Sequence, residues 1–123
     1  MKPAPAFAIA AMLGIPALAS DKPWQIQIHE QVHRLGHRNM IVVAHSAYPV
    51  QPGAGVFVIT TGASHQEVVA HTAKAIEDCP AVRPLIALDK EFAFVPDDRA
   101  PGASALRKSI LELLDGKSAA PIR

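Results

Sequence analysis

Apolar residues recur along this chain at two different spacings. A helical spacing of three or four predicts an α-helix that ends at Gly36, with one apolar face formed by Trp24, Ile28, Val32 and Leu35. The run Met40–Ala44 is apolar at every position, which is typical of a strand covered on both faces. We therefore expect Met40–Ala44 to be central in its sheet.

A strand, a helix and a strand follow. Val56–Thr61 is rich in β-branched residues, and Ser64 with Glu67 forms a capping box before a helix that Pro80 ends. Leu85–Leu88 predicts a further buried strand. Such a βαβ order predicts a three-layer α/β/α fold with a small, mostly parallel sheet.

The last part of the chain predicts one more helix. Glu91–Val95 fits either a short edge strand or an extended loop, and Pro96–Gly102 is irregular, with its charges in solvent. The helix runs from about Ser104 to Leu114 and ends at Gly116. Since no internal repeat or domain boundary is visible, residues 20–123 are expected to form one domain.

The N-terminal residues 1–19 have the pattern of an export signal. Lys2 supplies a positive charge, Ala6–Leu18 is uncharged and apolar, and Ala17–Ala19 matches a small-x-small cleavage site. The mature protein is expected to begin near Ser20, to be periplasmic or secreted, and to have no membrane segment after cleavage.

Charge and cysteine content exclude several classes. Twelve basic and eleven acidic residues give a net charge of +1, and no basic stripe exists that would bind nucleic acid. The single cysteine, Cys79, has no partner for an internal disulfide and is expected to be structural.

Six histidines carry the candidate chemistry, because an imidazole exchanges protons near neutral pH. His37 follows a helix C-terminus, where the helix dipole favours imidazolium. His45 closes the strand Met40–Ala44, and ligands of open parallel sheets gather beyond the carboxyl ends of strands. His45, Ser46 and Tyr48 therefore form the predicted site. His65 and His71 are interpreted as surface residues.

A metal site is the alternative use of the histidines. His29, His33 and His37 fall at four-residue steps, although Gly36 should end the helix before His37. A solvated polar face explains His29 and His33 equally well. The alternative is a periplasmic metal-binding protein that uses His29, His33 and His45.

The stretch Arg34–Asn39, with its Leu-Gly-His motif, the strand Met40–Ala44 and the following His45–Pro49 resemble the D-ribose pyranase and L-fucose mutarotase family. Looser matches follow in Thr60–Gly62, Val82–Ile86 and Asp89–Glu91, so that the similarity runs from about Trp24 to Gly116.

The resemblance implies a monosaccharide ligand, a homo-oligomer, and an isomerase that interconverts sugar ring forms or anomers without a cofactor or metal. It places acid–base catalysis on His37, with His45 as the second catalytic candidate. The candidate substrate-binding residues are Arg38, Ser46, Tyr48, Asp89 and Lys90.

Two departures qualify the resemblance. The family usually has an aspartate at the position of His45, and a second histidine there would lower the pKa of His37 instead of balancing its charge. The usual C-terminal helix and strand are also missing after Lys117. The chain is thus expected to be a truncated member, or to be completed by another subunit. A non-catalytic sugar-binding or interaction module that kept the fold is the alternative.

Overall fold

The computed structural model describes residues 6–11, 22–37, 39–49 and 53–123. The chain divides into two compact units, Met1–Val82 and Arg83–Arg123. The mixed α/β content expected from the sequence is present in the first unit. We expected a single domain, because the sequence shows no sign of a boundary between Val82 and Arg83.

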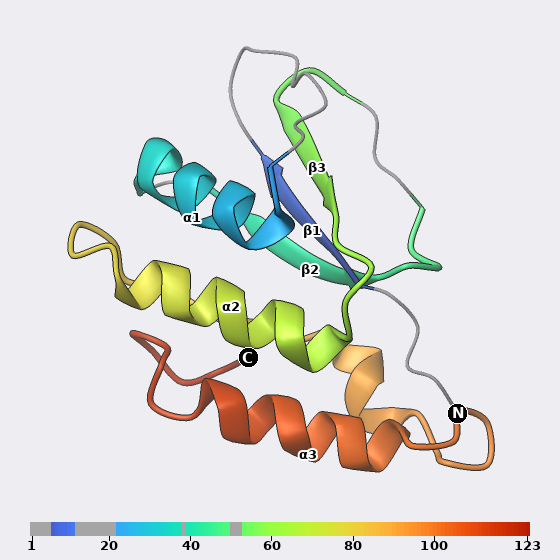
Figure 1. Cartoon of the computed structure of the whole chain (residues 1–123). Helices are drawn as coiled ribbons and strands as arrows, with labels where there is room; N and C mark the ends of the chain where they lie inside the picture. The colour runs from blue at the N-terminus through green and yellow to red at the C-terminus, as the bar shows by residue number, and fades with distance from the viewer. Residues whose placement is uncertain (1–5, 12–21, 38, 50–52) are drawn as a thin grey trace. The chain divides into compact units, whose positions relative to one another are not determined.

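The sheet of the first unit has three strands, β1 (Ala6–Ala11), β2 (Ile41–His45) and β3 (Val56–Thr60). β1 lies in the middle and is antiparallel to both neighbours (Figure 1). The strand pairs therefore differ from the expected mostly parallel sheet. The central position predicted for Met40–Ala44 is also wrong, because β1 occupies the middle and leaves β2 at an edge.

β1 falls within the segment that the sequence assigns to an export signal. Phe7 of β1 lies opposite both Ala44 of β2 and Thr60 of β3, so that β2 and β3 are level with each other. Two strands that are each antiparallel to a third run parallel to one another. β2 and β3 thus run in parallel, separated by β1.

Two helices of the first unit match the predicted elements. α1 spans Trp24–Leu35, and α2 spans His65–Glu77 after the N-cap Ser64. Gly36 ends α1 with φ 60° and ψ −148°, a conformation that only glycine adopts readily. The predicted end of α1 at Gly36 is confirmed.

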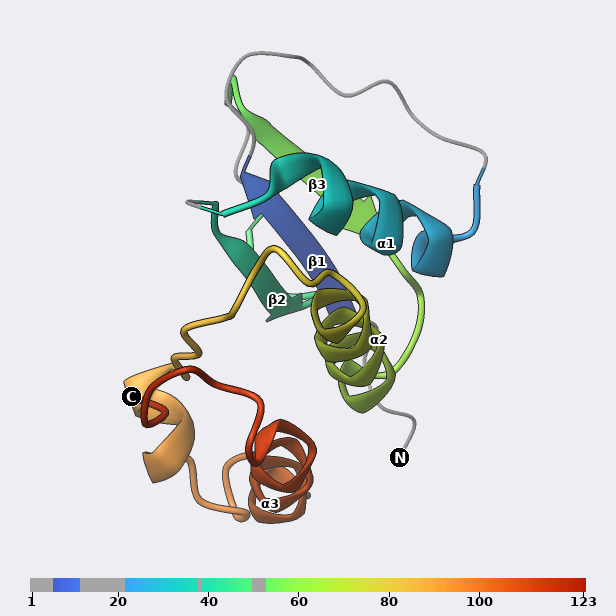
Figure 2. The same cartoon turned by 90° about the vertical axis from the view of Figure 1, so that its left-hand side faces the viewer.

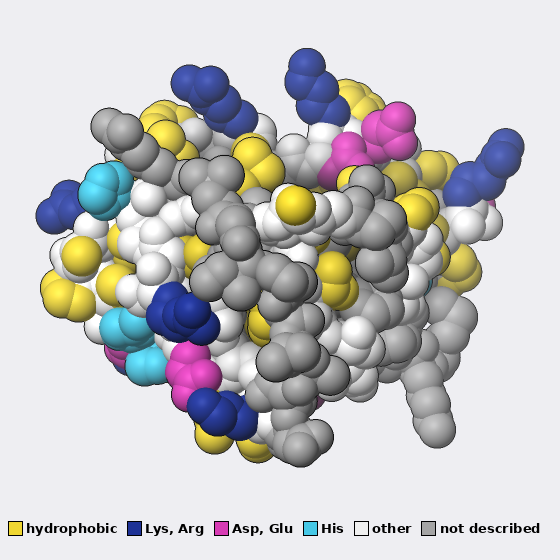
Figure 3. All heavy atoms as spheres, turned by 90° about the horizontal axis from the view of Figure 1, so that it is seen from above, with side chains coloured by type: hydrophobic (Ala, Val, Ile, Leu, Met, Phe, Trp, Pro, Cys, Tyr) yellow, Lys and Arg dark blue, Asp and Glu magenta, His cyan; other side chains and the backbone are white. Residues whose placement is uncertain are grey.

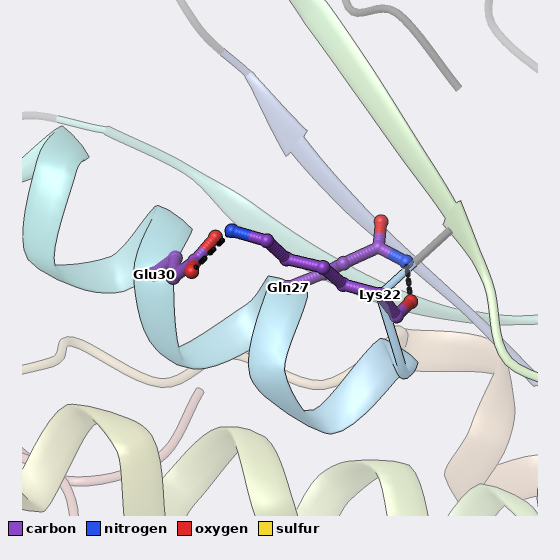
Figure 4. A network of polar contacts seen from close by, with 3 residues as sticks. All are labelled: Lys22, Gln27 and Glu30. Carbon is purple, nitrogen blue, oxygen red and sulfur yellow. Dashed lines mark hydrogen bonds and ion pairs between the residues drawn. The ribbon is translucent and has the colours of Figure 1, made fainter. Parts of the chain in front are cut away.

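The start of α1 is held without a side-chain cap at its N-cap Pro23. Instead, the Gln27 amide donates to the backbone oxygen of Lys22 at 2.6 Å, and the Lys22 ammonium pairs with Glu30 at 2.7 Å (Figure 4). Both partners of the ion pair are exposed, so this pair contributes at most about 1 kcal/mol.

Both helices pack against the same face of the sheet (Figure 2). Ile41 and Val43 of β2 and Phe57 and Ile59 of β3 alternate along their strands and join the core of the unit. The buried members of this core are Ile28, Val32, Ile59, Val68, Ala75 and Cys79. The burial of Cys79 agrees with its expected structural role.

The second unit contains the predicted last helix, α3 (Ala103–Leu114), with Ile110 and Leu114 buried. Asp97 lies in the loop before α3 and accepts a hydrogen bond from the backbone nitrogen of Ser104 at 2.8 Å. This bond lowers the pKa of Asp97. The expectation of a merely solvated loop therefore missed a cap for α3.

The predicted strand Leu85–Leu88 does not pair in the sheet. Its backbone bonds to the C-terminal segment instead, from the Leu88 nitrogen to the Arg123 oxygen at 2.8 Å and from the Arg123 nitrogen to the Ile86 oxygen at 3.4 Å. An apolar run of this length satisfies its backbone with any extended neighbour, so the pattern could not specify its partner. The predicted βαβ unit is consequently not formed.

Glu91–Val95 is neither a strand nor an extended loop. It belongs largely to a 3-10 helix, η1 (Lys90–Phe94). The Asp89 carboxylate accepts a hydrogen bond from the Glu91 nitrogen at 3.0 Å and thereby caps η1. The Arg107 guanidinium of α3 donates to the backbone oxygen of Phe92 at 2.8 Å and joins η1 to α3.

Candidate functional site

His45 ends β2 and is fixed by a tight turn. Its Nδ1 accepts a hydrogen bond from the backbone nitrogen of Ala47 at 3.0 Å, and its carbonyl oxygen accepts from the nitrogen of Tyr48 at 2.8 Å. Because Nδ1 accepts, the neutral ring carries its proton on Nε2. The ring is exposed, so Nε2–H of His45 is a donor presented at the carboxyl end of β2.

His65 is the first residue of α2 and is partly buried. The preceding Ser64 hydroxyl accepts a hydrogen bond from the Glu67 nitrogen at 3.2 Å, which fixes the first turn of α2. Burial lowers the pKa of His65, and the nearby charge of His45 lowers it further. His65 is therefore a neutral imidazole at neutral pH, and it lies near His45.

The chain topology explains why these two histidines meet. β2 and β3 run in the same direction, and their carboxyl ends lie at the same end of the sheet. Only residues 61–64 separate the end of β3 from His65, and α2 packs against β2. Sequence reasoning treated His65 as a surface residue. The missed signal was the short link of residues 61–64, which holds the first residue of α2 close to the end of β3.

His37 is not part of this arrangement. It follows Gly36, is exposed, and lies before the start of β2, whereas His45 is the last residue of β2. A strand rises about 3.3 Å per residue, which separates the two ends of β2 by about 13 Å. The structure thus places His37 and His45 beyond or at opposite ends of one strand, and the histidine that lies near His45 is His65.

The backbone around His37 is held by Asn39, whose side-chain amide donates to the His37 oxygen at 3.3 Å and also to the Leu35 oxygen. These contacts order the link between α1 and β2 without involving the His37 ring. Arg38, a predicted substrate-binding residue, lies outside the described residues.

The other predicted binding residues fall into two groups. Ser46 and Tyr48 lie in the turn after His45, and the exposed Tyr48 side chain is available to a ligand there. Asp89 and Lys90 belong to the second unit, where both are exposed and Asp89 caps η1. The local structure of Asp89 explains its carboxylate without a ligand.

His29 and His33 stack on α1, with ring centroids 4.4 Å apart and an interplanar angle of 30°. Asp78, which follows α2, has its pKa lowered chiefly by a hydrogen bond from Lys74 and further by the charges of His29 and His33. Among the described residues, no group of three His, Cys, Asp or Glu side chains is arranged to hold a metal ion. Within the described ranges, the structure therefore shows no third ligand beside His29 and His33.

The surface shown in Figure 3 carries its Lys and Arg side chains apart from one another or beside an acidic residue. This distribution agrees with the balanced charge of the sequence. In the described parts of the chain, none of the helices has the length and apolarity that crossing a bilayer requires.

An open hollow of about 500 Å³ lies within the second unit. It is formed by the end of α3, with Leu111 and Leu114, and by the following segment up to Ile122. None of the predicted site residues lines it, so it does not coincide with the histidine site.

Comparison with family models, with curated proteins and with solved structures gives no match to this chain. The functional conclusion therefore comes from the residues of the chain itself.

Proposed function

We propose that this chain is a monosaccharide mutarotase or pyranase-like protein, which interconverts sugar ring forms or anomers by imidazole acid–base chemistry. The supporting observation is the state of His45. Its turn holds one tautomer and presents Nε2–H at the carboxyl end of β2, beside the neutral ring of His65. Ser46 and Tyr48 add hydroxyl groups that suit a polyhydroxy ligand.

The reaction requires little beyond such groups. Opening a pyranose ring moves one proton off the anomeric hydroxyl and one onto the ring oxygen, and closing the ring reverses both steps. An imidazole with a pKa near the working pH accelerates transfers of this kind about 10²–10⁴-fold. No metal or cofactor takes part in the proposal.

His37 has a separate place in this proposal. Since it lies at the opposite end of β2 from His45, the two rings do not act on one sugar within one chain. We propose a homo-oligomer in which the Leu-Gly-His segment of one copy completes the site of another. Light scattering at micromolar concentration tests this, and a strictly monomeric mass would contradict it.

The proposal also includes export to the periplasm or beyond. Processing near Ser20 removes β1 and leaves β2 and β3, which already run parallel and level with each other. Closing the gap between them would give a parallel pair of strands, covered by α1 and α2 on one face. In this proposal the parallel pair belongs to the processed chain, and the antiparallel sheet belongs to the chain that still carries β1.

Exchange NMR tests the reaction directly. Saturation transfer between the anomers of common monosaccharides is measured with the wild-type chain, with His45→Gln and with His33→Gln as a matched control on α1. The expected result is acceleration by the wild type and by His33→Gln, and weaker acceleration by His45→Gln at sugar concentrations below saturation.

The same experiment separates the alternatives. Sugar binding without acceleration would replace the enzyme by a non-catalytic sugar-binding module. Neither binding nor acceleration with any monosaccharide would contradict both functions.

A further inference from the structure

We propose that His65 is the residue that carries the proton in this site, and that His45 positions the sugar by donating from Nε2. This assignment rests on the proposed function and adds to it a catalytic residue that the family motif does not contain. It divides between two histidines the work that the resemblance gives to His37.

The first argument is the geometry at the end of the sheet where β2 and β3 terminate. β2 ends with His45, β3 ends with Thr60, and these two residues lie opposite neighbouring positions of β1, Ala6 and Phe7. The four residues after Thr60 lead directly to His65, whose helix packs against β2. The two imidazoles therefore lie at the same end of the sheet, His45 at the end of a strand and His65 at the start of a helix.

The second argument is that the two rings differ in hydrogen bonding. Nδ1 of His45 is occupied by the Ala47 N–H, so protonating His45 would cost this bond. His65 has no such backbone bond to its ring among the described residues, and it keeps a free nitrogen for a substrate proton. His45 is thus suited to donate and His65 to accept.

The third argument is the charge environment of His65. Burial and the charge of His45 both lower the pKa of His65, and His45 is the titratable group seen to act on it in the described part of the chain. On α2 the nearest acidic residue, Glu67, is exposed. A neutral His65 at neutral pH is the protonation state that a base requires.

The proton transfers then balance as follows. The free ring nitrogen of His65 takes the proton of the anomeric hydroxyl, the C–O bond of the ring breaks towards the ring oxygen, and a carbonyl forms at the anomeric carbon. The imidazolium of His65 returns the same proton to the ring oxygen, to which His45 donates a hydrogen bond. Rotation of the carbonyl group and reversal of these steps give the other anomer.

The kinetic test uses His65→Gln, His65→Asn as a second variant, His45→Gln and the control His33→Gln. We expect both His65 variants to lower kcat by a factor of about 100 or more while KM changes little. We expect His45→Gln to act mainly by raising KM. Circular dichroism establishes that each variant is folded.

A second measurement, long-range ¹H–¹⁵N NMR of the imidazoles, does not depend on activity. We expect His45 to show the Nε2–H tautomer, and the titration midpoint of His65 to rise in His45→Gln because a neighbouring positive charge has been removed. A midpoint that does not move would show that the rings are not neighbours and would overturn the assignment.

The outcomes separate this inference from the proposed function. An active wild type whose folded His65 variants keep full kcat would overturn the role of His65 and leave the mutarotase in place. A wild type that accelerates no sugar would overturn the function and the role together, while the NMR titration would still report whether the two rings are coupled.

Discussion

The indole of Trp24 and the imidazole of His71 meet edge to face, with ring centroids 5.0 Å apart and an interplanar angle of 83°. Trp24 is the first residue of α1, and His71 lies in the middle of α2. The contact ties the start of α1 to α2, next to the core that both helices share. His71, expected to be an ordinary surface residue, therefore has a structural partner.

Removing this contact should lower stability. Trp24 is partly buried against the core, so we expect Trp24→Ala to lower the free energy of unfolding by about 2 kcal/mol, less than a fully buried tryptophan would cost. A double-mutant cycle with His71→Ala should give a coupling energy of about 0.5–1.5 kcal/mol, as for other aromatic pairs. Urea unfolding followed by circular dichroism measures both, and a coupling energy of zero would show that the rings do not interact in solution.

Stability should depend on pH through His65. The folded pKa of His65 is lowered, so the unfolded chain binds its proton more readily than the folded chain does. The contribution of His65 to the free energy of unfolding is therefore fully present above about pH 6.5, the ordinary pKa of histidine. This contribution is lost as the pH falls from there towards the pKa of His65 in the folded chain. The urea concentration at the unfolding midpoint should therefore decrease as the pH is lowered from 7.5 to 5.5.

Two variants identify the group responsible for this pH dependence. His65→Gln should give a flatter profile than the wild type, and His45→Gln should flatten it less, because burial is the larger cause of the shift. His33→Gln serves as the control and should keep the pH dependence of stability that the wild type shows between pH 7.5 and 5.5. A His65→Gln profile as steep as that of the wild type would contradict the prediction.

The N-cap of α2 should contribute measurably to the free energy of unfolding. Ser64→Ala removes the acceptor of the Glu67 nitrogen and should lower the free energy of unfolding by about 1 kcal/mol. Ser64→Asn keeps an acceptor at the N-cap and should restore most of this loss. Equal stability of Ser64→Ala and the wild type, measured by thermal unfolding, would show that the cap does not form.

Export predicts a shorter product. Mass spectrometry of the protein recovered from the periplasm or medium should show a chain that begins near Ser20 and has lost β1. Hydrogen exchange should then show continued protection of the alternate β2 amides that point to the neighbouring strand, because β3 takes the place of β1. An intact N-terminus on an exported chain would contradict processing, and unprotected amides in a processed chain would contradict direct pairing of β2 with β3.

The sequence by itself determined the three α-helices, the end of α1 and the cap of α2. The periodicity of Ile28 and Val32, the hydroxyl of Ser64 and the freedom of Gly36 are local signals, and each appears in the structure at the predicted place. Helix boundaries depend on residues within one or two turns, so that a single sequence suffices to find them.

Strand partners were decided only by the tertiary structure. Met40–Ala44 and Leu85–Leu88 both have the composition of buried strands, yet the first became an edge strand and the second bonded to the C-terminal segment. Backbone donors and acceptors are alike in every residue, and a short apolar run carries no record of which neighbour will satisfy them. The candidate site shows the same contrast. His45 was predicted from its own strand, whereas His65 lies near it because β2 and β3, which flank β1, have their carboxyl ends at the same end of the sheet.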